Sequence, residues 1–364
     1  MENLLAGDLD HVLDHTAELW DEFRGNGIFI TGGTGFFGCW LLESFAWAND
    51  RLGLKSKAVV LTRAPEAFRR KAPHLASHPA IALHTGDVCS FDFPAGRFSH
   101  VIHLAAESTS GLNERDPLAM LDSIVAGTRR TLDFAVAAGA SKFLLTSSGA
   151  VYGKQPAELT QVPETYAGAP DTMDQRSAYG EGKRLAELLC AIYHQRHGLE
   201  TKIARCFAFV GPHLPLDVHF AIGNFIRDAI GKQPVAIHGD GTPLRSYLYA
   251  ADLAIWLWTV LVRGESCRPY NVGSEESISI QDLAEAVART LGAQTAVQVA
   301  SKPVPGALPS RYVPSTGRAR RELGLAQHVP LGESIRRTAA WHLHQPSEAA
   351  DPATGPRRVA YVSN

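Results

Sequence analysis

The stretch Ile28-Phe-Ile-Thr-Gly-Gly-Thr-Gly-Phe-Phe-Gly38 decides the fold of this chain. Its apolar residues at 28–30 predict a buried strand, and residues 37–48 predict a helix behind it. Glycines between a strand and a helix allow a tight turn and let backbone amides approach a pyrophosphate at the helix N-terminus. The spacing is Gly-x-x-Gly-x-x-Gly, a variant of the usual Gly-x-Gly-x-x-Gly, so an ordinary strand–helix turn is the alternative.

Because both flanking elements are of the required type, we predict a dinucleotide-binding loop. The cofactor contacts expected in it are Gly32, Thr34, Gly35, Phe36, Phe37 and Gly38.

Short apolar runs recur along the rest of the chain and alternate with helical stretches. The expected strands are 58–61, 81–84, 100–104, 142–146, 201–205 and 270–272. The clearest helices are expected at 116–139 and 179–197, and the apolar run 253–262 predicts a buried helix. Unbroken apolar strands that alternate with helices indicate a parallel sheet covered on both faces. We therefore predict an α/β fold with a Rossmann-like, doubly wound parallel sheet of about seven strands.

Composition changes along the chain predict its domain organisation. Residues 1–25 carry apolar positions at helical spacing, which predicts an N-terminal amphipathic helix. Residues 26–205 (plus about 244–272) hold the nucleotide-binding pattern of the predicted Rossmann domain. Residues 206–243 and 273–340 are richer in Pro and Gly, which indicates a smaller C-terminal substrate-binding lobe. A flexible tail is expected at 345–364.

Bulk properties exclude several classes of function. The formal net charge of −2 gives no basic excess for nucleic acid or an anionic membrane. Five scattered cysteines without a Cys-x-x-Cys pair favour reduced thiols in a cytoplasmic protein and predict no metal site. The N-terminus is acidic, and no apolar run approaches the roughly 18 residues of a membrane span. We expect a soluble cytoplasmic protein with no membrane partner.

Tyr179 and Lys183 form the clearest candidate for proton chemistry. Four residues apart on a helix, the phenol and the ammonium point the same way, and a cation favours the phenolate. The pKa of Tyr179 is therefore expected to fall below its usual value of about 10. A hydroxyl at the carboxyl edge of strand 142–146 is placed to bind a substrate oxygen. Ser147 and Ser148 both qualify, and either could instead cap local amides; we select Ser148.

The ends of the other strands supply further cofactor contacts. Strand 58–61 leads to Arg63, where an NAD site usually has an acid and an NADP site a basic residue. We favour NADP(H), with NAD(H) possible and a plain surface arginine as the alternative. Asp87 with Val88 is a candidate adenine contact, although an Asp after Gly also makes a good turn. Small residues after strand 100–104 let a cofactor lie close to the backbone, namely Leu104, Ala105 and Ala106.

Together these residues resemble the extended, nucleotide-sugar-modifying branch of the short-chain dehydrogenase/reductase superfamily, from about residue 25 to 325. The pieces that carry the resemblance are Thr31–Gly38, His103-Leu-Ala-Ala-Glu-Ser108, Ser147-Ser-Gly-Ala-Val-Tyr-Gly153, Tyr179-Gly-Glu-Gly-Lys-Arg184, Asn224-Phe-Ile226, Gly239-Asp-Gly-Thr-Pro-Leu-Arg-Ser246 and Tyr270-Asn-Val-Gly273. Each piece alone is weakly specific, whereas their order and spacing are highly specific.

The resemblance implies a catalytic set of Ser148, Tyr179 and Lys183. Tyr179 would move the hydroxyl proton while a hydride passes between the sugar and the nicotinamide, and Lys183 would hold the nicotinamide ribose. The substrate would be a nucleotide-diphosphate sugar, with contacts from Ser108, Ser148, Asn224, Arg245 and Arg311. A solvated surface arginine is the alternative for Arg311. The helices at 116–139 and 179–197 are those through which relatives form homodimers.

Departures from the family pattern narrow the reaction. Relatives that are dehydratases have an Asp-Glu pair where this chain has Gly149-Ala150, and glucuronate decarboxylases keep a Glu at the position of Ala150. Without these carboxyl groups, elimination of water and decarboxylation are both disfavoured. Relatives usually carry Asn where Ala208 stands, so the substrate is held differently.

We therefore expect an NADPH-dependent reductase of a nucleotide-linked 4-keto-6-deoxyhexose, acting at carbon 4 in deoxysugar synthesis. The alternative is a redox-neutral nucleotide-sugar 4-epimerase that uses bound NAD. A non-catalytic cofactor-binding protein on the same fold is a minor alternative, because Ser148, Tyr179 and Lys183 are all present.

Overall fold

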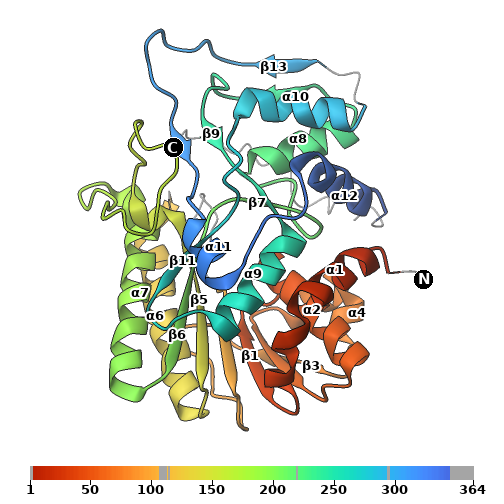
Figure 1. Ribbon diagram of the computed structural model, residues 1–364, viewed down its shortest axis with the longest axis vertical. Helices are drawn as coiled ribbons and strands as arrows, with labels where there is room; N and C mark the ends of the chain where they lie inside the picture. The colour runs from red at the N-terminus through yellow and green to blue at the C-terminus, as the bar shows by residue number, and fades with distance from the viewer. Residues whose placement is uncertain (1–2, 106–112, 114, 219, 293–295, 345–364) are drawn as a thin grey trace.

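A computed structural model of the chain describes residues 3–105, 113, 115–218, 220–292 and 296–344. A large sheet flanked by helices forms the lower part of the molecule in Figure 1, and a smaller lobe lies above it. The expected positions Ala106 and Ser108 and the tail 345–364 lie outside the described residues.

The sheet has seven strands in the order β11-β6-β5-β4-β1-β2-β3, and every neighbouring pair is parallel. Its strands are β1 (Gly27–Thr31), β2 (Lys57–Thr62), β3 (Ile81–Thr85), β4 (His100–His103), β5 (Lys142–Ser148), β6 (Glu200–Cys206) and β11 (Pro269–Val272). The predicted doubly wound parallel sheet is confirmed. Strand order reverses between β1 and β4, and ligands of such sheets bind at the carboxyl ends beside this point.

Helices cover both faces of the sheet. The pair α6 (Pro117–Ala137) and α7 (Ala178–His197) packs on one face, where Phe29 points. On the other face, where Ile28 and Ile30 point, lie α1 (Ala6–Thr16), α2 (Phe36–Leu52) and α9 (Ala250–Arg263). Burial on both faces explains the unbroken apolar strands, and α9 is the expected buried helix.

The N-terminal segment differs from the single helix expected there. Helix α1 ends at Thr16, and a 3₁₀ helix, η1, continues over Ala17–Phe23. The Thr16 hydroxyl donates to the Val12 carbonyl at 2.6 Å and accepts from the indole of Trp20 at 2.9 Å. The tighter turn brings Trp20 and Phe23 into the core, where both are buried.

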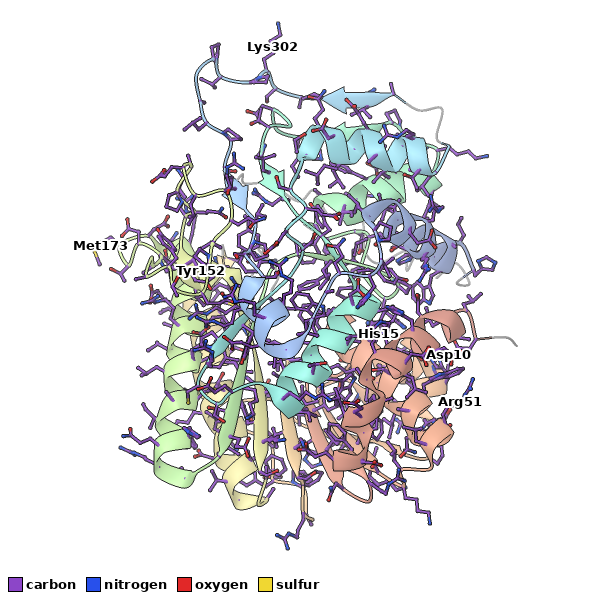
Figure 2. All side chains as sticks on the ribbon, viewed as in Figure 1. Asp10, His15, Arg51, Tyr152, Met173 and Lys302 are labelled. Atoms are coloured by element: carbon purple, nitrogen blue, oxygen red, sulfur yellow. The ribbon has the colours of Figure 1, made fainter. Side chains whose placement is uncertain are left out.

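Polar side-chain contacts at the surface of the molecule join helix α1 to helix α2. The Asp10 carboxylate accepts from the Trp47 indole at 2.9 Å and lies 3.6 Å from Arg51. Asp10 and Arg51 are labelled in Figure 2, at the right-hand edge of the molecule. Helices α3 (Pro65–Lys71) and α4 (Pro73–Ala76) connect β2 to β3.

The smaller lobe is built from short elements around its own core. Its helices are α8 (Ala221–Ile230), α10 (Ile280–Thr290) and α12 (Leu331–His344). Two of its small sheets have two strands each: β10 (Leu248–Tyr249) with β7 (Phe209–Val210), and β13 (Val297–Val299) with β8 (Val235–Ile237). A third small sheet has the strand order β12 (Ile278–Ser279), β9 (Leu244–Arg245) and β14 (Arg311–Tyr312). Strand β9, which was expected with the nucleotide-binding part, pairs here. Helix α11 (Gly317–Leu323) packs back against β11. Among the described residues, no helix is long and apolar enough to span a membrane.

Candidate active site

The glycine loop sits at the carboxyl end of β1, beside the reversal of strand order. Gly32 has a φ of 69°, and a Cβ there would lie 2.7 Å from the amide nitrogen of Ala105. A Cβ on Gly38 would lie 2.3 Å from the backbone of Gly33. Only glycine therefore permits both the turn and the close approach of α2 to the loop.

Helix α2 begins at Phe36, with Gly35 as its N-cap and no side chain capping its first turn. Such a helix end presents backbone amides and the positive end of the helix dipole. Thr34 precedes the cap, and its carbonyl accepts from Lys71 at 2.8 Å. Phe36 and Phe37 are half-buried and pack on the core beneath. This cradle fits the pyrophosphate of a dinucleotide.

The other expected cofactor contacts lie along the same edge of the sheet. Leu104 and Ala105 donate to the Thr31 carbonyl and hydroxyl at 3.1 and 3.3 Å. Arg63 follows β2 and is exposed to solvent. Val88 packs against α6, where a Cβ on Gly127 would touch it. Arg63, Val88, Leu104 and Ala105 therefore follow strands β2, β3 and β4, at the same edge of the sheet as the glycine loop.

Asp87, the expected adenine contact, also has a local role. Its carboxylate accepts from the amide of Cys89 at 2.9 Å, and its carbonyl accepts from the amides of Ser90 and Phe91. This is the turn geometry that was the alternative for Asp87.

Tyr179 and Lys183 lie on the first turns of α7, facing the carboxyl end of β5. The Lys183 ammonium is buried and donates to the Thr146 carbonyl at 2.8 Å. It lies 5.9 Å from the centre of the Tyr179 ring. Burial lowers the pKa of Lys183 to about 8.

The prediction that the pKa of Tyr179 falls below its usual value is wrong for the protein without a bound cofactor. Burial raises this pKa to about 12, against a hydrogen bond with Ser148 that lowers it. The Lys183 ammonium donates to a backbone carbonyl and not to the phenol, and desolvation of the buried phenol is the main cause of the shift. Tyr179 is therefore a protonated phenol at neutral pH.

The structure separates the two serines at the end of β5. Ser147 donates to the Glu187 carboxylate at 2.5 Å, away from Tyr179. Ser148 caps the 3₁₀ helix η2 (Gly149–Tyr152) through the amide of Ala150 at 3.1 Å, which was its alternative role, and it also lies close enough to Tyr179 to lower the pKa of that phenol. Its contact with a substrate oxygen stays a prediction.

Tyr312 is a site residue that the sequence analysis did not identify. Its hydroxyl lies 3.4 Å from the Ser148 hydroxyl, and its ring packs on Phe207 with centres 4.7 Å apart. Burial raises the pKa of Tyr312, the bond with Ser148 lowers it, and the neighbouring Tyr179 raises it further. Three hydroxyl groups, of Ser148, Tyr179 and Tyr312, thus gather at the end of β5.

The same contacts close the space beside Gly149. A Cβ on Gly149 would lie 2.7 Å from both the Tyr312 hydroxyl and the Phe207 ring. No larger side chain fits at position 149 unless Tyr312 and Phe207 move.

The expected substrate arginines fall on different faces of the small sheet. Arg245 is paired in register with Tyr312, and Arg311 with Leu244, so Arg245 shares the face of Tyr312 while Arg311 lies on the other. Burial lowers the pKa of Arg245. Asn224, on α8, is buried and accepts from Arg227 at 3.1 Å. Successive side chains of a strand point to opposite faces of its sheet. A prediction of strand β14 from the sequence would therefore have placed Arg311 and Tyr312 on different faces.

A buried polar network supports the site from behind. Arg205 donates to the Glu187 carboxylate at 2.9 and 2.6 Å and to the Tyr152 hydroxyl at 2.9 Å. Tyr152, labelled in Figure 2, donates in turn to Asn271 at 2.8 Å. This network joins the ends of β6 and β11 to α7. No periodic pattern in the sequence indicates this network, because its members come from separate elements.

A profile of the NAD dependent epimerase/dehydratase family matches residues 28–273. The chain belongs to this family. The matched residues include the glycine loop of this chain and helix α7, which carries Tyr179 and Lys183. This agrees with the resemblance to nucleotide-sugar-modifying enzymes.

Curated relatives of the chain are named as decarboxylases. UDP-glucuronic acid decarboxylase 1 of Arabidopsis thaliana is 31% identical over 310 residues, which cover 85% of this chain and 68% of that protein. UDP-glucuronic acid decarboxylase 1 of Xenopus tropicalis is 28% identical over 337 residues, covering 91% and 76%.

Solved structures with the same fold include 4-epimerases. A UDP-glucose 4-epimerase from Thermotoga maritima superposes with a TM-score of 0.73 at 19% identity, covering 87% of this chain and 98% of that one. A UDP-N-acetylglucosamine 4-epimerase from Methanobrevibacter ruminantium gives 0.76 at 20% identity, covering 88% and 99%. At these identities the likeness establishes the fold alone.

Proposed function

We propose that this protein transfers a hydride at carbon 4 of a nucleotide-diphosphate sugar, with Tyr179 as the proton donor. The observation that carries the proposal is the gathering of Ser148, Tyr179 and Lys183 at the carboxyl end of β5, beside a glycine loop suited to a dinucleotide. In doubly wound sheets this edge is where ligands bind.

The direction we favour is reduction of a ketone to an alcohol. The Tyr179 phenol holds its proton at neutral pH and can supply the proton that a reductase needs for the new hydroxyl. The absence of an acid after β2, where Arg63 stands, favours an exchangeable NADPH as the hydride source. The closed space beside Gly149 argues against elimination of water, because a carboxylate side chain does not fit at that position.

Each residue then has one task. Tyr179 gives its proton to the carbonyl oxygen, and Ser148 hydrogen bonds to that oxygen and orients it. Lys183 exchanges its bond to the Thr146 carbonyl for the ribose of the nucleotide and supports the developing phenolate. The bound nicotinamide nucleotide supplies the hydride. Arg245, on the face of Tyr312, is placed for the diphosphate.

We further propose that the cofactor is NADP(H), and that the substrate is a 4-keto-6-deoxyhexose. Strand β2 ends at Thr62 followed by Arg63, so no acid stands where one would bind the adenosine ribose of NAD. The exposed guanidinium of Arg63 suits a 2′-phosphate.

A second candidate is a redox-neutral reaction on tightly bound NAD. It is favoured by the 31% identity to a UDP-glucuronic acid decarboxylase and by the family to which the chain belongs. In this case carbon 4 would be oxidised and later reduced at the same site, as in 4-epimerisation.

A panel of substrates separates the two candidates. Purified protein is incubated with nucleotide-linked 4-keto-6-deoxy sugars and NADPH, and separately with UDP-glucose and UDP-glucuronic acid without added cofactor. Loss of NADPH absorbance in the first set, abolished by Tyr179→Phe, is the expected result. Conversion of UDP-glucose or UDP-glucuronic acid without net cofactor change would select the second candidate. No conversion in either set would contradict both.

We also propose that the protein is a homodimer formed through α6 and α7. Leu118 on α6 and Leu185 and Leu188 on α7 are large apolar side chains exposed to solvent. Exposed apolar residues on one pair of packed helices are typical of a subunit interface.

A further inference from the structure

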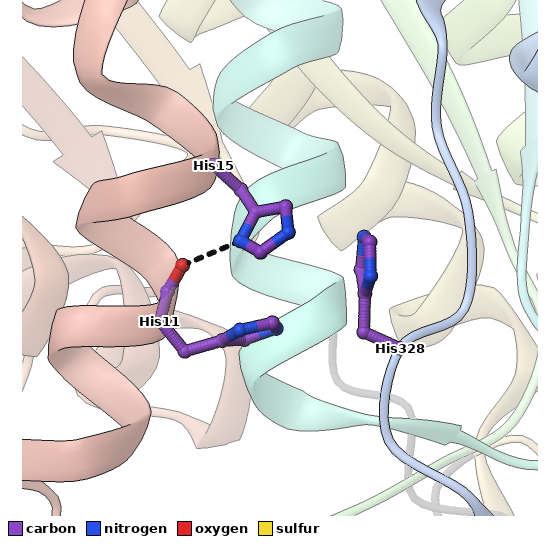
Figure 3. A group of neighbouring side chains, drawn as sticks. All are labelled: His11, His15 and His328. Carbon is purple, nitrogen blue, oxygen red and sulfur yellow. Dashed lines mark hydrogen bonds between the residues drawn. The ribbon is translucent and has the colours of Figure 1, made fainter.

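Three histidines meet at the surface between the N-terminal helix and the segment that precedes α12. His11 and His15 are four residues apart on α1 and so share one helix face. His328 comes from the segment between α11 and α12 and faces them (Figure 3). One ring nitrogen from each lies within 4.8 Å of the other two. Small side-chain rotations would bring the three onto one ion, because zinc–nitrogen bonds are about 2.0–2.1 Å.

The hydrogen bond drawn in Figure 3 orients one of these rings. His15 Nδ1 lies 2.9 Å from the His11 carbonyl, which can only accept, so Nδ1 carries the proton. The lone pair is then on Nε2, directed away from the helix. A metal-binding histidine is commonly fixed in this way by a carbonyl on its other nitrogen.

Behind the cluster lies an acid without a full set of partners. Asp252, on α9, is completely buried, and its Oδ1 is 3.6 Å from His11 Nε2. Neither atom makes a hydrogen bond. The second oxygen of Asp252 accepts from the amides of His328 and Val329, both at 3.0 Å, and so holds the segment that carries His328. The two atoms face each other, so Asp252 is placed to orient the His11 ring from behind and leaves its Nδ1 for an ion.

We propose that His11, His15 and His328 form a binding site for a divalent transition-metal ion of the zinc class. Three imidazoles are a ligand set that suits zinc, and a buried carboxylate behind one of them orients that ring and balances part of the charge. His15 and His328 are exposed, so an ion can reach the site from solvent.

The fourth coordination position is open to water. His15 and His328 line the rim of a surface hollow of about 250 Å³, whose other lining residues include Leu19, Ile255, Thr259 and Leu325. A water or a small anion from this hollow completes the coordination of the ion.

The site would join the two parts of the molecule. Helix α1 packs on α9 and α2 of the large sheet, and it already reaches α12 through an ion pair of Asp8 with Arg337. Asp8 also accepts from the Tyr249 hydroxyl at 2.6 Å. An ion held by α1 and His328 adds a second link to the smaller lobe, so binding should stabilise the folded chain.

The test uses the full chain without a polyhistidine tag, stripped with a chelator and titrated with zinc against a competing chromophoric chelator. We expect one equivalent bound with micromolar or tighter affinity, an increase in Tm, and a visible absorption spectrum of four-coordinate Co²⁺ when cobalt replaces zinc. His15→Gln and His328→Gln should each weaken binding at least about tenfold, and Asp252→Asn about 10- to 100-fold. His344→Ala, which removes an exposed histidine at the end of α12, is the matched control and should bind as the unmodified chain does.

The substituted histidines are exposed, so their variants should keep the fold, which far-UV circular dichroism checks. Failure of the unmodified chain to bind one equivalent would overturn the proposal, and so would equal affinity in His15→Gln, His328→Gln and the control. Either result would mean that the histidines only pack against one another, with ring centres 4.2 to 5.2 Å apart. The result does not depend on the proposed hydride transfer.

Discussion

Replacing Lys183 by methionine is expected to abolish turnover and yet stabilise the protein measured without cofactor. Methionine has a similar length but no charge, so the variant removes an ammonium that is 3% exposed. It also removes the bond from that ammonium to the Thr146 carbonyl. Loss of the buried charge should raise the free energy of unfolding, and loss of the hydrogen bond should lower it.

Burial lowers the pKa of Lys183 to about 8 from its ordinary value of 10.5. At 1.36 kcal/mol per pKa unit, keeping the buried side chain charged at pH 7 costs about 3 kcal/mol. The lost hydrogen bond has a charged donor and is worth about 1.5–3 kcal/mol. The variant is therefore expected to be more stable than the unmodified protein by about 1 kcal/mol at pH 7.

This advantage should disappear at higher pH. The folded pKa of Lys183 lies below the unfolded one, so between about pH 8 and 10.5 the unfolded chain binds more protons, and stability rises with pH. From pH 8 to pH 10 the unmodified protein should gain about 2 kcal/mol relative to the variant. Subtracting the two proteins cancels titrations that they share.

Urea unfolding followed by tryptophan fluorescence at pH 7, 8, 9 and 10 measures the difference. A methionine variant that is less stable at pH 7 would refute the reasoning, as would a difference that does not change with pH. Either result would mean that the ammonium is already well solvated or paired within the fold.

Three further outcomes test separate parts of the account. Arg63→Ala should weaken NADPH binding much more than NADH binding, measured by fluorescence titration, whereas Arg70→Ala, an exposed arginine on α3, should change neither. Gly149→Ala should lower the free energy of unfolding by about 1–3 kcal/mol through overpacking, and should also lower kcat. Gly239→Ala, where a Cβ meets nothing within 4 Å, is the control and should change neither. Equal behaviour of the two variants would show that the site tolerates a side chain at position 149. Leu188→Arg should halve the mass measured by sedimentation, and a mass unchanged from that of the unmodified chain would argue against an interface on α7.

Local patterns were enough to predict the fold. Strands buried on both faces are continuous apolar runs, so each of the seven strands was visible in the sequence near its observed bounds. The glycine loop was predictable for the same reason, because a left-handed turn at Gly32 and close packing at Gly38 exclude other residues. The pair Tyr179 and Lys183 followed from helical spacing.

Features that depend on distant residues were not predictable. Tyr312 reaches Ser148 from 164 positions along the chain, and it came from a strand too short to be seen. The pKa of Tyr179 was predicted with the wrong sign, because spacing shows the neighbouring Lys183 but not the burial that outweighs it. The prediction of no metal site rested on cysteine spacing and stays a prediction; the proposed histidine site also depends on a distant residue, because His328 joins His11 and His15 only in the fold.

The most direct test of the central claim follows the hydride itself. The protein is incubated with NADPH carrying deuterium at the transferred position of the nicotinamide and with a nucleotide-linked 4-keto-6-deoxy sugar, and the product is analysed by mass spectrometry. We expect deuterium at carbon 4 of the sugar, and none with Tyr179→Phe even though that variant still binds NADPH. Product formed without deuterium, or a Tyr179→Phe variant that transfers it at the unmodified rate, would contradict the account.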